Sequence, residues 1–289
     1  MTTALLQSQA GRDKMRSMRK LYRVSKIAVP LVVIFLAASV LYWALYQLPY
    51  FGDFDSVYYP VLFLDNPYDH IGFLNPPWVL VALYPLKVLP PHAAGAVWML
   101  FSVVSVLYCA RQLGADRLAY LLIFINPAFI RFMTSGQLDA LVLYGLVVNH
   151  PGLSVLLLTI KPQVIGTAVL FRLRHLITKH AVMIAAVVVA SFIALGNWPA
   201  MMWHNWSNGV NHAVSMDIFP YGTPIGAALL WWSIKNDKPV IGALASYFFA
   251  PYVSPSSVFI YSVLIFSTFA TIPRIVVFVL LWIVALVLT

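Results

Sequence analysis

Apolar segments separated by short polar turns make up almost the whole chain. The first segment, 27–46, is long enough for one helix to cross the hydrocarbon core of a bilayer, which takes about 20 residues. The pattern predicts an all-α polytopic membrane protein with about eleven transmembrane helices. The later segments expected to cross are 92–110, 118–134, 138–150, 152–160, the stretch from Gln163 to Arg172, 180–196, 221–234, 239–253, 255–271 and 274–289.

The segment 75–90 is the exception. It is apolar and carries proline near both ends, but at about 15 residues it is shorter than a full crossing requires. We therefore expect a half-inserted helix on the side of the preceding polar loop. Hydrophobic residues make up 62% of the 289 residues and charged residues only 9%, against about 25% charged in soluble domains. This composition excludes an ordinary soluble domain.

The positive charge is concentrated at the N-terminus. Seven of the 18 Lys and Arg residues lie in 1–26, which we expect to be a cytoplasmic segment beside anionic lipid headgroups, with no role in nucleic-acid binding. If 75–90 does not cross, the cytoplasmic turns hold every other basic residue except Lys87, Arg131 and Lys161. The predicted organisation is a single transmembrane domain over 27–289, with the N-terminus in the cytoplasm and external loops at 47–91 and 197–220.

The expected external face carries most of the candidate chemistry. Its first polar interval holds four of the nine acidic residues, Asp53, Asp55, Asp65 and Asp69. Acidic side chains are costly in lipid, so this cluster must lie outside the hydrocarbon or line a wet cavity. Short broken helices are also tolerated only where they line a cavity or pack on protein. We therefore expect a cleft that opens to the non-cytoplasmic side.

Several motifs follow one another between residues 52 and 255, namely Gly52-Asp53-Phe54, Val57-Tyr58-Tyr59, Asn66-Pro67-Tyr68-Asp69, Pro76-Pro77, Leu89-Pro90 with Trp98, Gly136-Gln137-Leu138-Asp139, Lys161-Pro162-Gln163 and Ala250-Pro251-Tyr252-Val253-Ser254-Pro255. In this order they resemble the GT-C glycosyltransferases, and most closely their polyprenyl-phosphomannose-dependent mannosyltransferase-like family. The chain is shorter than is usual in that family, and its Asp-Phe-x-Val-Tyr pattern carries one extra residue, which leaves open whether Asp53 or Asp55 matches the family's aspartate.

The resemblance implies transfer of a hexose, with mannose as the leading candidate, from a polyprenyl-phosphate donor to a hydroxyl group. The acceptor is a glycan, lipid or protein, and the reaction takes place on the external, periplasmic or lumenal face. It implies an aspartate, Asp53 or Asp55, as general base in an inverting displacement, with no separate cofactor and no metal indicated. An aspartate in the loop can serve as such a base, and cations at headgroup depth would stabilise the leaving phosphate. The expected substrate-binding residues are Lys161, Gln137, Asp139, Arg131, Gln163 and Tyr58.

Structural roles compete with these assignments. Asp53 and Asp55 could serve only in turns, where aspartate is favoured. Lys161 could be a lysine that snorkels near a helix end, and Arg131 could pair with Asp139 across the turn. At the level of the whole protein, the alternatives are a lipid or solute transporter or flippase, and a non-catalytic membrane subunit of a larger complex or oligomer. His204 and His212 alone do not make a metal site.

Overall fold

The computed structural model describes residues 39, 42–44, 46–47, 51–209 and 215–288. The chain divides into two units, Met1–Gln47 and Leu48–Thr289, and the site lies in the second. The basic segment 1–26 and most of the first expected span, 27–46, fall outside the described residues. Every regular element in the described part is helical, which confirms the all-α prediction.

Short elements build the region before the first long helix. They are η1 (Phe54–Tyr58), η2 (Pro60–Phe63), η3 (Pro67–Asp69), α2 (Val79–Leu83) and η4 (Tyr84–Val88). The remaining elements are α3 (Pro91–Gln112), α4 (Arg117–Phe124), α5 (Pro127–Ser135), α6 (Asp139–Val147), α7 (Pro151–Leu158), α8 (Pro162–Ile165), η5 (Gly166–Ala168), α9 (Val169–Leu173), α10 (Thr178–Leu195), α11 (Trp198–Gly209), α12 (Thr223–Lys235), α13 (Pro239–Phe249), α14 (Val258–Thr268) and α15 (Thr271–Leu288).

Two described helices, α3 and α10, are long and apolar enough to cross a membrane. The number rises to four if each of two bent pairs forms one span, namely α4 with α5, bent by 61°, and α7 with the α8–α9 stretch, bent by 107°. The structure therefore supports two to four spans by length and composition, which is fewer than the eleven or so expected. The other apolar stretches of the described chain fall below the length of a span, and they are Val79–Val88, Pro239–Phe249, Val258–Thr268 and Thr271–Leu286.

Proline accounts for several of the breaks between helices. Pro127, Pro151 and Pro162 each stand at the first position of a helix, where the missing N–H costs nothing, and each prevents the preceding helix from continuing. Asn126 caps α5 by accepting a hydrogen bond from the Ala128 N–H. The break before Pro162 leaves Lys161 between two helices and not on a lipid-facing helix surface.

The region expected to be the first external loop is folded onto the helices. The Asn75 side chain donates to the Ile160 carbonyl at 3.0 Å, and the Trp78 indole N–H donates to the Leu156 carbonyl at 2.8 Å. From the other side, the buried Asn205 amide on α11 donates to the Tyr68 carbonyl at 2.9 Å. The segment expected to be half-inserted, 75–90, forms a helical stretch over Val79–Val88, which is about 15 to 18 Å long and too short for a full crossing.

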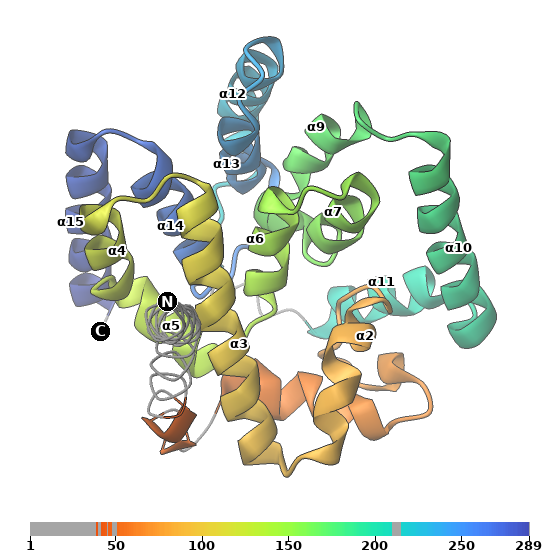
Figure 1. Ribbon diagram of the computed structural model, residues 1–289. Helices are drawn as coiled ribbons and strands as arrows, with labels where there is room; N and C mark the ends of the chain where they lie inside the picture. Colours follow the sequence, from red (N-terminus) through yellow and green to blue (C-terminus); the bar gives the residue numbers. More distant parts are fainter. Residues whose placement is uncertain (1–38, 40–41, 45, 48–50, 210–214, 289) are drawn as a thin grey trace, which may run out of the picture. The chain divides into compact units, whose positions relative to one another are not determined.

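The second expected external loop, 197–220, is largely helical in its described part, since α11 covers Trp198–Gly209. Figure 1 shows α12 and α13 side by side as a pair, and α4, α14 and α15 gathered together. Between these groups, α6 packs against both α3 and α7. The first residue of α6, Asp139, is fully buried in this arrangement.

Candidate functional site

Two glycine turns cross at the centre of the site. Gly52 has φ +31° and Gly136 has φ +64°, a region that residues with a Cβ rarely adopt. A Cβ on Gly136 would lie 2.5 Å from the Phe54 Cβ, and one on Gly52 would lie 2.9 Å from the Ser135 Cα. Glycine at both positions therefore lets the two backbones approach closely, which brings Asp53 against Gln137.

Four side chains join in a row at this crossing, and we call them the carboxylate–lysine cluster: Asp53, Gln137, Lys161 and Asp139. The Gln137 Nε2 donates to Asp53 Oδ2, and the Lys161 Nζ donates to Gln137 Oε1. The Lys161 Nζ also lies 2.8 Å from Asp139 Oδ1. Because lysine only donates and a carboxylate only accepts, this is the one orientation of the Gln137 amide that satisfies both neighbours.

Burial differs along the row. Asp139, Gln137 and Lys161 are 0%, 3% and 7% exposed, whereas Asp53 is half-buried. Within the described residues, neither Asp139 oxygen accepts a hydrogen bond of good geometry. The charge of this carboxylate is therefore compensated by the nearby Lys161 ammonium group and not by hydrogen bonds. Burying such an ion pair costs free energy, because both charged groups lose their contact with water. The cluster is thus anchored at its buried end and accessible at Asp53.

The environment of Asp53 changes its acidity. Burial raises the pKa of the Asp53 carboxyl above its usual value, and the Lys161 charge and the Gln137 hydrogen bond offset only part of that rise. A carboxylate with a raised pKa accepts a proton more readily than an ordinary aspartate, which is the property a general base needs.

Tyr58 contacts the same amide. Its hydroxyl lies 3.4 Å from Gln137 Oε1, and the side chain is 4% exposed. Burial raises the pKa of the Tyr58 phenol well above its usual value, so the group stays neutral and able to donate. The structure therefore brings five of the eight expected site residues together, namely Asp53, Tyr58, Gln137, Asp139 and Lys161.

Asp55 has a different partner. Its Oδ2 accepts a hydrogen bond from the Phe51 backbone N–H at 2.7 Å, which closes the turn ahead of η1. Its neighbours in the polar interval, Asp65 and Asp69, are exposed. Of the two candidates for the general base, only Asp53 joins the cluster.

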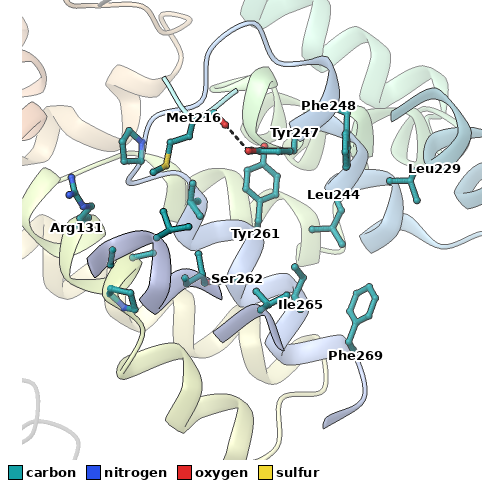
Figure 2. Close-up of a pocket in the computed structure, with 18 residues that line it drawn as sticks. Arg131, Met216, Leu229, Leu244, Tyr247, Phe248, Tyr261, Ser262, Ile265 and Phe269 are labelled. Carbon is teal, nitrogen blue, oxygen red and sulfur yellow. Dashed lines mark hydrogen bonds between the residues drawn. The ribbon is translucent and has the colours of Figure 1, made fainter. Parts of the chain in front are cut away.

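Arg131 and Gln163 also lie apart from the cluster. The alternative that Arg131 pairs with Asp139 is wrong, because Asp139 pairs with Lys161. Arg131 is exposed and instead lines an apolar cavity of about 670 Å³ (Figure 2). Gln163 is half-buried and contributes its backbone carbonyl, which accepts from the Tyr261 hydroxyl at 3.3 Å.

Two further aromatic residues support the cluster and were not among the expected site residues. The buried Trp98 donates its indole N–H to the Gln137 carbonyl at 3.3 Å. Burial and, as a smaller effect, the nearby Asp53 charge raise the pKa of the half-buried Tyr252 phenol. Both lie in motifs that carry the family resemblance, and that was the signal by which they could have been found. Within the described residues, no group of three or more His, Cys, Asp or Glu side chains is placed to hold a metal ion.

Comparison with family models, with curated proteins and with solved structures found no match for this chain. What the site can do is therefore argued from its own geometry. A half-buried carboxylate is held by a buried amide, which a buried ion pair holds in turn. This arrangement suits proton abstraction from a hydroxyl at a fixed position.

Proposed function

We propose that the chain is an integral membrane glycosyltransferase that moves a hexose from a polyprenyl-phosphate donor to an acceptor hydroxyl on the non-cytoplasmic face, with mannose as the leading candidate for the hexose. The proposal includes a multi-pass topology with the N-terminus in the cytoplasm and a GT-C-like arrangement of helices. One observation carries it: Asp53 is the accessible end of a row whose other members, Gln137, Lys161 and Asp139, are buried. The motifs that meet in this row are those that carry the resemblance.

The reaction balances with Asp53 as the base. Gln137 occupies Oδ2 of Asp53, which leaves Oδ1 to take the proton of the acceptor hydroxyl. The acceptor oxygen then forms a bond to the anomeric carbon while the bond from that carbon to the phosphate oxygen breaks. The polyprenyl phosphate leaves with the electron pair, and attack opposite the leaving group inverts the anomeric centre. A single carboxylate suffices for this displacement, unlike the paired acids of glycoside hydrolysis.

In this scheme Lys161 acts through Gln137. Its Nζ is engaged by Gln137 and Asp139 and is buried, so its first role is to fix the amide that orients Asp53. We therefore treat Lys161, Asp139 and Gln137 as positioning residues and Asp53 as the catalytic residue. Tyr58 completes the set by placing its hydroxyl against the same amide oxygen.

A second function has one observation in its favour. Ionisable residues buried between broken helices also mark the pathways of ion-coupled transporters, and the Asp139–Lys161 pair stands beside such a break. A transporter would move substrate across sealed vesicles without forming a new glycosidic bond. The non-catalytic subunit would show neither activity.

The test uses the full chain in proteoliposomes with labelled polyprenyl-phosphate hexose and a panel of acceptor glycans and lipids. Asp53→Asn keeps the shape and can still accept from Gln137, yet it cannot take a proton. We expect transfer to fall by at least about 100-fold, the usual contribution of a general base. Asp55→Asn is the matched control, two residues away on the same turn, and should retain transfer within a few-fold. Full transfer by Asp53→Asn would remove the catalytic assignment, and uptake without transfer would favour the transporter.

A further inference from the structure

A large apolar cavity lies among α5 and the four consecutive helices α12 to α15. Its volume is about 670 Å³, within the roughly 300–1,000 Å³ typical of ligand sites. Side chains of α5, α12, α13, α14 and α15 line it, including Leu229, Leu244, Val258, Ile265 and Leu281. Figure 2 shows Arg131 at one edge of this cavity and Leu229 and Phe269 at the other.

Among the described residues that line the cavity, Arg131 is the one with a charged side chain. It is exposed, and within the described residues no carboxylate or hydrogen-bond acceptor engages its guanidinium group. A guanidinium group carries five N–H donors in a fork that matches phosphate oxygens. An apolar cavity with a single unpaired guanidinium at its edge therefore complements a ligand with a hydrocarbon body and an anionic end.

Two connections lead from the cavity lining toward the carboxylate–lysine cluster. Tyr261 lines the cavity, and its hydroxyl donates to the Val164 carbonyl, three residues after Lys161. Arg131 lies about one helical turn, or roughly 6 Å, before the end of α5, and the chain then passes through Gly136 to Gln137. A ligand with its anion at Arg131 would thus have that end toward the cluster and its hydrocarbon body away from it.

We propose that this cavity binds the isoprenoid chain of the donor and that Arg131 binds its phosphate. The inference rests on the proposed function, and it assigns the phosphate to Arg131 and not to the buried, already paired Lys161. A cavity of this size takes one segment of a long chain, and the remainder extends into the bilayer.

The experiment measures binding of a photoreactive polyprenyl phosphate without a sugar to the full purified chain. Arg131→Gln should weaken binding by about 10- to 100-fold, as expected from loss of a charge-assisted hydrogen bond, and should leave binding of the matching polyprenol unchanged. Leu244→Trp, which fills the cavity, should weaken both lipids. Ile130→Trp is the control, because this residue is 60% exposed, adjacent to Arg131 and absent from the lining.

Three results would overturn the inference: unchanged binding in Arg131→Gln, equal binding of phosphatidylglycerol and polyprenyl phosphate, or photolabelling confined to helices other than those of the cavity. Failure of the proposed function looks different. Wild type without transfer, whose lipid binding still depends on Arg131 and Leu244, keeps the cavity assignment and removes the enzyme. If transfer depends on Asp53 while both cavity variants bind the lipid normally, the enzyme assignment stands and the cavity assignment is removed.

Discussion

The carboxylate–lysine cluster and the cavity each contain one cation of the expected external face, and they hold it in opposite ways. Lys161 is 7% exposed and contacts both Gln137 and Asp139. Arg131 is exposed at the edge of an apolar cavity and has no acidic partner in the described part of the chain. The side of the membrane on which a cation is expected therefore does not assign its role. Burial and partners separate a residue that positions others from one that is available to a ligand.

The largest expected effect tests this difference through stability. Lys161→Met should lower the free energy of unfolding by about 3–5 kcal/mol, because it leaves the Asp139 carboxylate buried without its counter-charge. Arg131→Met should change it by no more than about 0.5 kcal/mol, because no partner is lost. Denaturant unfolding in mixed micelles measures both values. Similar small losses for the two variants would mean that the ion pair is not buried as described.

A double variant refines the same measurement. Lys161→Met combined with Asp139→Leu removes both charges and fills the space with apolar atoms, so most of the lost stability should return. If the double variant is as unstable as Lys161→Met alone, the loss comes from packing and not from an unpaired charge. The buried end of the cluster would then be structural in a way that the ion pair does not explain.

The crossing of the two glycine turns gives the next effect. Gly136→Ala places a Cβ 2.5 Å from the Phe54 Cβ at a positive φ, and overpacking of this kind costs about 1–3 kcal/mol in addition to backbone strain. Gly114→Ala is the control, because its φ is also positive but the nearest atom to the added Cβ is 3.9 Å away. The difference between the two free energies of unfolding measures the cost of steric crowding, because the backbone strain is common to both variants. Transfer activity should fall only in Gly136→Ala, since the added Cβ moves Asp53 away from Gln137. Equal effects of both variants on stability and transfer would show that the close approach is not needed.

Much of the cluster could be predicted because its members are polar residues in apolar surroundings. Gln137, Asp139 and Lys161 interrupt long apolar stretches, and such residues have to find partners. Between Asp53 and Asp55 the sequence did not decide, because both lie on one polar turn. The decision depends on Gly52 and Gly136, whose positive φ values emerge only when the two segments cross.

Other features depended on packing between distant segments. The helix α10 (Thr178–Leu195) lies close to the segment 180–196 expected from apolar length, whereas α11 (Trp198–Gly209) was expected to be loop. Its Trp, His and Asn residues give no apolar run, and it is tied down by the contact of Asn205 with Tyr68. The cavity could not be predicted, because residues from Pro127 to Ala285 meet in it and, apart from Arg131, none of them is unusual in its own segment.

The smallest expected effect is a pH dependence that is set by the Asp53 carboxyl and modified by its partner Gln137. Because burial raises the pKa of the Asp53 carboxyl, the folded chain binds this proton more readily than the unfolded chain does. The contribution of Asp53 to stability is therefore greatest below the usual value of 3.8 and declines as the pH rises through the folded pKa. Transfer has the opposite dependence, since the base must be ionised, so kcat/KM should fall on acidification at a pH above 3.8.

Gln137→Leu sharpens this last prediction. The Gln137 hydrogen bond is one of the interactions that lower the pKa of Asp53, so its removal should move the acidic limb of the kcat/KM profile further toward neutral pH. Asp55→Asn should leave the limb in place, because Asp55 bonds to the Phe51 backbone and not to Gln137. A limb that stays fixed in Gln137→Leu, or one that moves in Asp55→Asn, would show that the titrating base is not the carboxylate held by this amide.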